Sequence, residues 1–276
     1  MSDERPIGIF DSGVGGLTVL RALRSALPAE PTVYLGDTAR VPYGTRSAQT
    51  VVKYALNNAR TLVKQADIKL LVVACNTVSA VALDALRADL PIPVVGVIDP
   101  GARAALSSSS ASATIAVLGT AGTTRSGAYP RALLALGHRG VVVVVKAPLL
   151  VPLAEEGWTS GEVPFLVAQR YLEQLPDDVE VVVLGCTHYP LLAPVIRRAL
   201  QSLRPQARVV DGAEATAADV AVLLDVRGLR APASSALRHR LLVTDAPEQM
   251  VSLAPAFLGA SIGVDEVELV DVEMTA

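Results

Sequence analysis

The sequence predicts an α/β protein with two pseudo-symmetric domains, whose largely parallel sheets face each other across a central cleft. Short apolar runs alternate with longer helical patterns along the chain, and this alternation is typical of the α/β class. The runs are rich in Val, Ile and Leu, which suits strands buried on both faces of a parallel sheet. The order of the motifs also repeats once along the chain, and the repeat predicts two similar halves.

The apolar runs are the candidate strands. In the first half they cover 6–10, 32–36, 69–74 and 92–98, and in the second half 114–119, 140–145, 179–185 and 207–211. Helical patterns lie between them, for example at 46–65 and 77–90. The serine-rich segment 106–114 breaks the pattern, and we expect it to be a flexible loop that separates the two halves.

The two halves resemble each other in the order of their motifs. The stretch "FDSGVGGLTVLRAL" begins at Phe10, and "LGTAGTTRSGAYPRAL" begins at Leu118. Later in each half, an apolar run ends in a cysteine that is followed by a small polar residue and the start of a helix, at Cys75 and at Cys186. The distance along the chain between the first pair of stretches is similar to the distance between the two cysteines. Although strand–helix units resemble one another in general, this agreement predicts duplication or pseudo-symmetry.

Composition excludes several classes of protein. The chain has 276 residues, enough for two domains, and is 51% apolar and 18% charged, which argues against disorder. A net charge of −3 and only 4% aromatic residues give no reason to expect a nucleic-acid partner. The charged amino terminus does not resemble a secretory signal, and the most apolar stretch, 140–154, is interrupted by a lysine and two prolines. We therefore expect a cytoplasmic protein with no membrane span and with free thiols.

The cysteines are the strongest candidates for chemistry. A free cysteine is commonly just a small buried hydrophobic residue, but a thiol at a strand-to-helix turn lies where unpaired N–H groups favour the thiolate. The next residues, Asn76 and Thr77, could simply cap a helix. His188, two residues after Cys186, could be an ordinary packed histidine, but beside a cleft thiol it could also relay a proton. The matched pair of cysteines favours a functional role.

Polar residues at other strand ends are expected to share the cleft, because ligands of open α/β sheets bind beyond the carboxyl ends of the strands. These residues include Asp11, Ser12, Asp37 and Thr120. The loop "DSGVGG" at 11–16 could hold an anion on its N–H groups, but it matches no complete nucleotide-binding motif. The loop "GDTARVPYGTRS" at 36–47 is either a second polar loop of the site or a plain connection.

Two matched thiols across a cleft suit one kind of reaction. Inversion of a carbon that bears hydrogen requires a proton to leave one face and another to arrive at the opposite face. Two thiols achieve this with little substrate movement, because a thiol pKa near ~8.5 allows either protonation state. The residues therefore indicate racemisation or epimerisation. A zinc site or a redox disulfide is less consistent with the sequence, because Cys-x-x-Cys spacing is absent.

Six segments resemble cofactor-independent glutamate racemases of the aspartate/glutamate racemase family. They are "GIFDSGVGGLTVL", "GDTARVPYGTRS", "VVACNTVSA", "VVGVIDPGA", "VPLAEEG" and "VLGCTHYPLL". The resemblance implies that Cys75 and Cys186 are the two acid–base groups, assisted by Asp11 and His188 respectively. It further implies a substrate-binding set of Asp11, Ser12, Tyr43, Gly44, Asn76, Thr77, Thr187 and His188, with Thr120, Thr123 and Glu155 also in the cleft. One departure is Ala147, where relatives often have a third, non-catalytic cysteine.

The resemblance also implies the domain arrangement and the biological role. The first domain would comprise 1–99 plus 213–276, and the second 100–212. The activity would be interconversion of L- and D-glutamate without a cofactor or metal, supplying D-glutamate for peptidoglycan synthesis, and thus for cell wall biogenesis and cell shape. Glutamate is the expected small-molecule partner. A homodimer is a possible assembly that the sequence does not decide.

Three alternatives remain at this stage. The chain could be a racemase for aspartate or another amino acid, or a non-catalytic protein that binds a ligand or partner on the same scaffold. A pyridoxal-phosphate racemase is also conceivable, with Lys146 at a strand end as the Schiff-base lysine.

Overall fold

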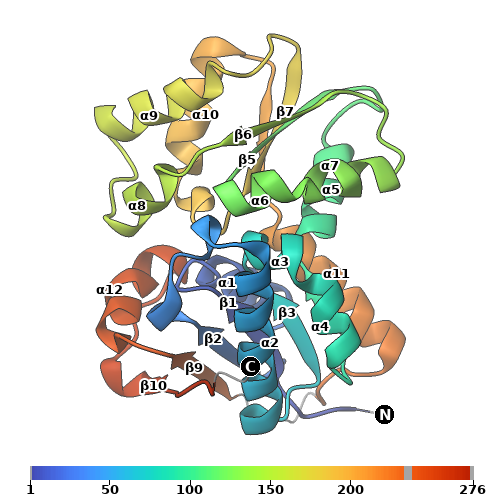
Figure 1. The fold of residues 1–276 in the computed structure, drawn as a ribbon, viewed down its shortest axis with the longest axis vertical. Helices are drawn as coiled ribbons and strands as arrows, with labels where there is room; N and C mark the ends of the chain where they lie inside the picture. Colours follow the sequence, from blue (N-terminus) through green and yellow to red (C-terminus); the bar gives the residue numbers. More distant parts are fainter. Residues whose placement is uncertain (1, 233–237, 274–276) are drawn as a thin grey trace.

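The computed structural model describes residues 2–232 and 238–273, and it contains two parallel sheets, one in each half of the molecule (Figure 1). The first sheet has six strands in the order β10-β9-β2-β1-β3-β4, and the second has four in the order β6-β5-β7-β8. Every described strand pair in both sheets is parallel. The predicted fold class is confirmed.

The strands and helices alternate along the chain. The strands are β1 (Ile7–Asp11), β2 (Thr32–Gly36), β3 (Leu70–Val73), β4 (Val94–Gly96), β5 (Thr114–Gly119), β6 (Val142–Lys146), β7 (Val179–Gly185), β8 (Arg208–Val210), β9 (His239–Val243) and β10 (Val267–Leu269). The α-helices are α1 (Leu17–Ala26), α2 (Ala48–Ala66), α3 (Asn76–Val81), α4 (Leu83–Asp89), α5 (Ile98–Ser107), α6 (Ala121–Ser126), α7 (Ala128–Ala135), α8 (Leu150–Glu155), α9 (Glu162–Leu172), α10 (Ala193–Leu203), α11 (Ala213–Arg227) and α12 (Pro247–Phe257). Short 3-10 turns are η1 (Thr38–Arg40), η2 (Tyr43–Thr45), η3 (Tyr189–Leu192) and η4 (Val264–Glu266).

All eight predicted strands form, within a few residues of the expected bounds. The predicted helix at 77–90 is instead two helices, α3 and α4, which meet at Ala82. The serine-rich segment begins inside α5, which continues to Ser107. Two further strands, β9 and β10, were not predicted from the sequence, and they extend the first sheet at one edge.

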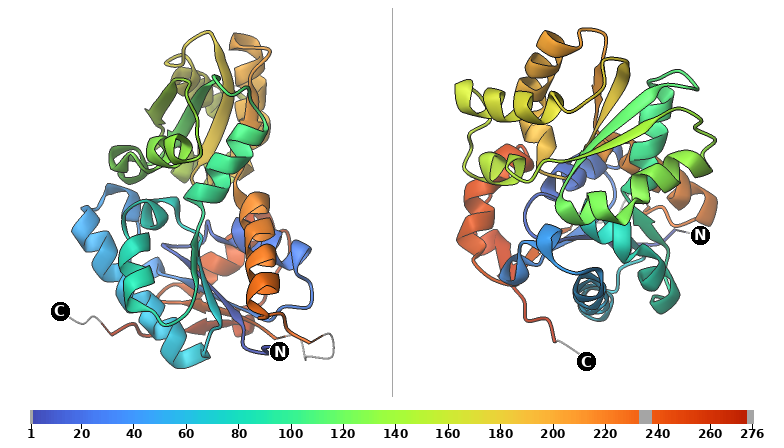
Figure 2. Two further views of the ribbon diagram at one scale, coloured as in Figure 1. Left: turned by 90° about the vertical axis from the view of Figure 1, so that its right-hand side faces the viewer. Right: turned by 45° about the horizontal axis from the view of Figure 1, so that its top comes forward.

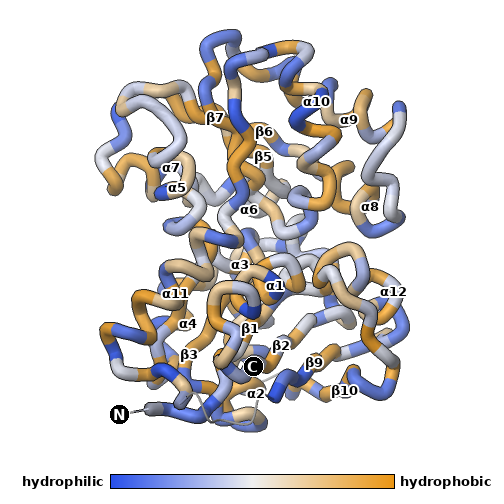
Figure 3. The backbone as a smooth tube through the Cα atoms, turned by 180° about the vertical axis from the view of Figure 1, so that it is seen from behind, coloured by the Kyte–Doolittle hydropathy of each residue, from blue (hydrophilic) through white to orange (hydrophobic). Residues whose placement is uncertain are grey.

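Helices cover both faces of each sheet, which is why the central strands are apolar (Figures 2 and 3). In β1, Ile7 and Ile9 belong to the hydrophobic cluster shared with α1 and α11, whereas Phe10 belongs to the cluster shared with α2. In the second sheet, α5 and α7 share a cluster with alternate residues of β5 and β7. Since successive side chains of a strand point to opposite faces, each central strand is packed between two layers of helices.

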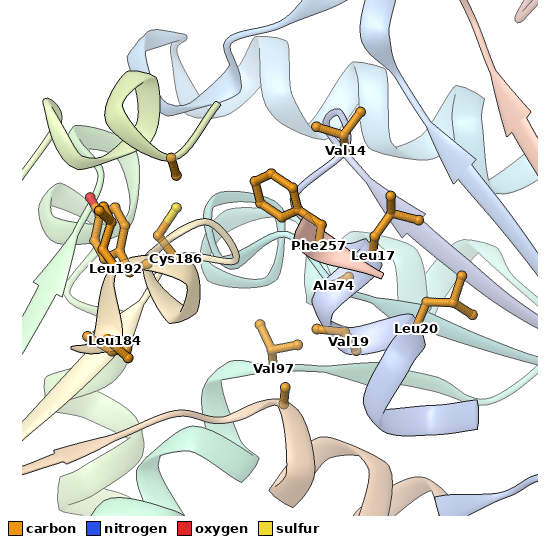
Figure 4. Packing of buried hydrophobic residues seen from close by; sticks show 14 of the residues in the cluster. Val14, Leu17, Val19, Leu20, Ala74, Val97, Leu184, Cys186, Leu192 and Phe257 are labelled. Carbon is orange, nitrogen blue, oxygen red and sulfur yellow. The ribbon is translucent and has the colours of Figure 1, made fainter. Parts of the chain in front are cut away.

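The hydrophobic core is continuous between the two halves. One cluster contains Leu17 and Val19 of α1, Val97 before α5, and Leu184 of β7. Figure 4 shows these side chains together with Cys186 and Phe257 of α12. Burial of apolar side chains across the boundary stabilises one arrangement of the two sheets, at about 25 cal/mol for each Å² removed from water.

The chain passes between the halves twice. It leaves the first sheet after β4 through α5, and returns from the second sheet after β8 through α11. The two crossings lie side by side, because a Cβ on Gly212 would be only 3.1 Å from the Cα of Gly101. The division into 1–99 plus 213–276 and 100–212 stays a prediction, and its residues 1, 233–237 and 274–276 lie outside the described residues. Within the described part of the chain, every helix is too short or too polar to cross a membrane.

Candidate active site

The two cysteines follow equivalent strands of the two sheets. In the first sheet β1 lies between β2 and β3, and in the second β5 lies between β6 and β7. Cys75 follows the end of β3 by two residues, and Cys186 directly follows β7. The carboxyl ends of both sets of strands meet at the boundary between the halves (Figure 1). The motif repeat noted in the sequence therefore corresponds to an equivalence in three dimensions.

A cavity of about 350 Å³ lies at this boundary and contains both cysteines in its wall. The sequence-predicted residues that line it are Ser12, Tyr43, Gly44, Cys75, Asn76, Thr77, Thr120, Glu155, Cys186, Thr187 and His188. Three other predicted residues, Asp11, Asp37 and Thr123, are buried outside the lining set. The volume lies near the lower end of the range of small-molecule sites.

Cys75 is a buried thiol at the N-cap position of α3. It is 6% exposed, and its Sγ lies 3.4 Å from Ser12 Oγ. The pKa of Cys75 is raised to about 12, mainly by burial and also by the nearby Asp11 carboxylate, whereas the contact with Ser12 opposes the shift. Cys75 is therefore a neutral thiol at neutral pH, with a proton to give.

Cys186 lies beside a histidine that is paired with a carboxylate. Its Sγ is 3.8 Å from His188 Nδ1, and His188 Nε2 is 2.9 Å from Glu155 Oε1. Burial lowers the pKa of His188, but hydrogen bonds with Cys186 and Glu155 outweigh this effect and raise the pKa to about 10. At neutral pH the imidazole is therefore protonated, and its positive charge faces the Cys186 sulfur.

A glycine allows this histidine to reach its position. Gly15 lies in the turn between β1 and α1, and a Cβ there would lie 2.5 Å from His188 Cε1. The side chain of Thr187 would be crowded by the same atom. The turn after β1 of the first sheet therefore packs directly against the Cys186 loop of the second sheet.

Asp11 lies under the wall of the site rather than in it. Its side chain is fully buried, and Oδ2 accepts a hydrogen bond of 3.0 Å from the Gly13 N–H. Its Oδ1 has no hydrogen-bond partner among the described residues. Burial raises the pKa of Asp11, while the charge of His188 and backbone N–H groups lower it. The carboxyl group is thus electrostatically coupled to both His188 and Cys75.

Three threonine hydroxyls meet across the boundary. Thr77 Oγ1 of α3 lies 2.9 Å from Thr120 Oγ1 and 3.4 Å from Thr123 Oγ1. Thr120 also caps α6 by accepting a hydrogen bond from the Thr123 N–H at 3.4 Å. Because each hydroxyl is both a donor and an acceptor, the cluster connects the halves and still presents polar groups to the cavity.

The loop after β2 forms another wall, and a buried carboxylate anchors it. The Tyr43 hydroxyl donates to Asp37 Oδ2, which also accepts a 3.1 Å hydrogen bond from Asn58 Nδ2. Asp37 Oδ1 pairs with Arg40 at 2.6 Å and accepts from Thr244 Oγ1 at 2.8 Å. The Tyr43 hydroxyl is therefore committed to Asp37, and Tyr43 presents its ring and backbone to the cavity.

Residues 7–220 match the family model described as Asp/Glu/Hydantoin racemase. The chain belongs to this racemase family.

Similar racemases cover nearly the whole chain. The glutamate racemase of Geobacter metallireducens is 51% identical over 260 residues, which is 94% of each chain. The crystal structure of the Thermus thermophilus glutamate racemase in complex with β-chloro-D-alanine has a TM-score of 0.87 at 43% identity, with full coverage of both chains. The Francisella tularensis glutamate racemase in complex with D-glutamate has a TM-score of 0.89 at 35% identity, covering 98% of this chain and 99% of that one.

Two further walls of the racemase cavity were missed by sequence reasoning. Pro148, Val151 and Pro152 contribute an apolar wall from α8 and the turn before it, and Gln249 reaches the cavity from α12. The "VPLAEEG" motif was a signal for the α8 wall. Nothing in the local sequence marks Gln249, because it comes from a segment far along the chain that only the fold brings to the site.

The cavity of this racemase is lined by neutral groups and one Glu–His pair. Within the described chain, no lysine or arginine lines it, and Lys146 at the end of β6 lies outside it. No group of three or more His, Cys, Asp or Glu side chains is placed to hold a metal ion among the described residues. Hydroxyls, amides and backbone N–H groups are thus the donors available to a bound anion.

Proposed function

We propose that this chain is a glutamate racemase that interconverts the L- and D-enantiomers with two thiols and without a cofactor. The observation that carries the proposal is the pair of free, buried cysteines at equivalent strand ends of two sheets, both in the wall of one cavity. Glutamate as substrate is supported by relatives that are named glutamate racemases, at 51% and 45% identity, and by the complex of one relative with D-glutamate.

The reaction consists of two proton transfers at one carbon. The thiolate on one side takes the α-hydrogen as a proton, and the electron pair of the broken C–H bond stays on the substrate as a carbanion. The thiol on the other side gives its proton to the opposite face of that carbon. The product is the mirror image, and the two sulfurs have exchanged protonation states, so that the reverse reaction uses the same groups.

The environments of the two thiols suit opposite protonation states at the start of the reaction. Cys75 is held neutral by burial and serves as the acid, while Cys186, which faces the protonated His188, serves as the base. After turnover the roles reverse. Asp11 is proposed to assist Cys75, because its carboxyl group lies close enough to affect the pKa of that thiol.

Neutral donors are proposed to bind the amino acid. Glutamate has two carboxylates and one ammonium group, and the cavity offers the side chains of Ser12, Asn76, Thr77, Thr120 and Thr187 together with the backbone of the Tyr43–Gly44 turn. A buried anion requires hydrogen bonds to replace its lost water.

We further propose that the D-glutamate produced is used for peptidoglycan synthesis. The protein would act in the cytoplasm, where the reducing environment keeps both thiols free. Assembly as a homodimer stays a prediction, and light scattering on the purified protein checks it.

The deciding experiment is incubation of purified protein with L-glutamate in D₂O, without added cofactor. Loss of optical activity together with one solvent deuterium at the α-carbon is the expected result. L-aspartate is the control substrate. Reaction of aspartate in place of glutamate would keep the two-thiol mechanism and overturn the substrate. If folded, reduced protein reacted with neither, the proposed activity would be wrong, and a binding protein on this scaffold would be favoured.

A further inference from the structure

A buried tyrosine joins the two loops that carry the cysteines. Tyr129 lies at the start of α7 and is 2% exposed. Its hydroxyl donates a 2.8 Å hydrogen bond to Asn76 Oδ1, and Asn76 directly follows Cys75. Its ring packs against Gly185, where a Cβ would lie 3.2 Å from Tyr129 Cε2, and Gly185 directly precedes Cys186. One side chain therefore contacts both cysteine loops.

The tyrosine ring has little freedom to move. On its other side lies Gly101 of α5, where a Cβ would be 3.0 Å from the Tyr129 oxygen. Two glycines thus form a slot for one ring, at the place where the chain crosses between the halves. Because the hydrogen bond to Asn76 crosses from the second half to α3 of the first, it fixes the position of the Cys75 loop relative to the Cys186 loop.

The same hydrogen bond determines which way the Asn76 amide points. Asn76 lines the main cavity, and it also lines a cavity of about 20 Å³ behind it, which Tyr129 shares. When the amide oxygen accepts from Tyr129, the NH₂ group is on the opposite side, and the structure shows no hydrogen bond from it to any described residue. Without the hydroxyl the amide could turn over, and its oxygen would then oppose a substrate carboxylate.

Tyr129 remains a donor over the whole working range of pH. Burial raises its pKa above the ordinary value, and the charges of Asp211 and Cys186 act in the same direction. The phenol does not line the main cavity, so it has no direct contact with a substrate held there.

We propose that Tyr129 is a positioning residue for the racemisation, which orients the Asn76 amide toward the substrate and holds the two cysteine loops in register. This inference rests on the proposed glutamate racemase function. Tyr129, a buried residue of the second half, thus acts through Asn76, a residue of the first half.

The test is Tyr129→Phe, which removes the hydroxyl and keeps the ring in its slot. We expect kcat/KM to fall about five- to tenfold for both enantiomers, mainly through a higher KM, as loss of one neutral hydrogen bond predicts. The control is Ser202→Ala, because the Ser202 hydroxyl also donates a hydrogen bond, of 2.7 Å, to the Ala199 carbonyl in the last turn of α10, a helix that contributes no residue to the cavity lining. That variant should keep kcat/KM within about twofold.

A double-mutant cycle separates positioning from a general structural role. In an Asn76→Ala background there is no amide to orient, so Tyr129→Phe should cause no further loss of kcat/KM. Equal losses in both backgrounds, or an unchanged kcat/KM for Tyr129→Phe alone, would overturn the inference while wild-type racemisation stands. A wild-type protein that does not racemise glutamate would overturn the proposed function and this inference with it.

Discussion

At the scale of single residues, the two thiols occupy matched positions but have different neighbours. Cys75 contacts the neutral hydroxyl of Ser12, whereas Cys186 contacts a histidine that is paired with Glu155. A symmetric reaction is thus carried out by an asymmetric pair. Because the two sides differ, variants on the two sides should differ as well.

Replacement of either thiol should separate the two directions of the reaction. Cys75→Ser should slow removal of the α-proton from one enantiomer by about 10²- to 10⁴-fold, and Cys186→Ser should do so for the other enantiomer, because a serine hydroxyl is a far weaker base. Release of label from α-tritiated L- and D-glutamate measures each direction. Equal losses for both enantiomers, together with lost substrate binding, would point to a structural role for the cysteines.

Glu155→Gln should shift the alkaline limit of activity. The glutamine keeps a hydrogen-bond acceptor beside His188 but removes the charge, so the pKa of His188 should fall from its value of about 10. Activity that needs the protonated imidazole should then be lost at a lower pH, by about one unit. The profile of kcat/KM against pH for wild type and variant is the measurement. An unchanged alkaline limb would show that His188 does not control this ionisation.

The same histidine links pH to stability. Its pKa in the folded protein is raised above the unfolded value of about 6.5, so the stability it contributes is complete below that pH. This contribution is lost as the pH rises through about 10. Urea unfolding at pH 6 and pH 10 should show a smaller difference for Glu155→Gln than for wild type.

At the scale of elements, the turn between β1 and α1 determines how closely the halves approach. Gly15→Ala should push His188 and Thr187 away from their positions, because the added Cβ would lie 2.5 Å from His188 Cε1. Overpacking of this kind costs about 1–3 kcal/mol of stability, and a displacement of about 1 Å in a catalytic group can reduce the rate about 10²-fold.

Gly13→Ala in the same turn is the matched comparison for Gly15→Ala. Its added Cβ would lie 3.1 Å from Val41 Cγ1, the end of a side chain that can shift. Steady-state kinetics and thermal unfolding of both variants give the measurement. Similar losses for the two variants would contradict the importance of the His188 contact.

The strands that could be predicted from the sequence differ in their burial from those that could not. Central strands such as β5, where every residue is buried, are recognisable because both of their faces are apolar, and β6 and β8 keep a run of valines although they are partly exposed. In contrast, β10 has three residues, two of them exposed, and so lacks the apolar run by which a strand is found. The break at Ala82 could not be predicted either, because Ala is a good helix former and gives no local signal of a break.

The candidate site was predictable for a related reason. Side chains such as Ser12 and Cys75 directly follow buried strands, and parallel strands bring their carboxyl ends to one edge. Gln249 depends on how a distant segment packs around that edge, which no local pattern reports, whereas the wall formed by α8 was indicated only by the "VPLAEEG" motif. Tyr129 was likewise missed, since its role depends on a slot between two glycines from different elements.

At the scale of the whole molecule, a buried ion pair joins distant segments at the end of the first sheet opposite to the cavity. Lys69 Nζ, just before β3, lies 2.6 Å from Glu30 Oε2 and donates a 2.7 Å hydrogen bond to the Asp3 carbonyl. Glu30 Oε1 accepts a 2.9 Å hydrogen bond from the Ala231 N–H, beyond α11. The pair thus connects the amino-terminal segment to the chain that returns from the second half.

Lys69→Met should destabilise the protein by about 3–5 kcal/mol, because it leaves the Glu30 carboxylate buried without its partner. The loss should be smaller at low pH, where the isolated carboxyl group can take up a proton. In Lys69→Met/Glu30→Gln no buried charge remains, so part of the stability should return. Urea unfolding measures each variant, and kcat/KM should be unchanged at temperatures where the variants are folded, since the pair lies at the amino ends of strands whose carboxyl ends form the site. If Lys69→Met lowered the free energy of unfolding by less than about 1 kcal/mol, water would have access to the ion pair. The segments would then be held together by the hydrophobic core alone.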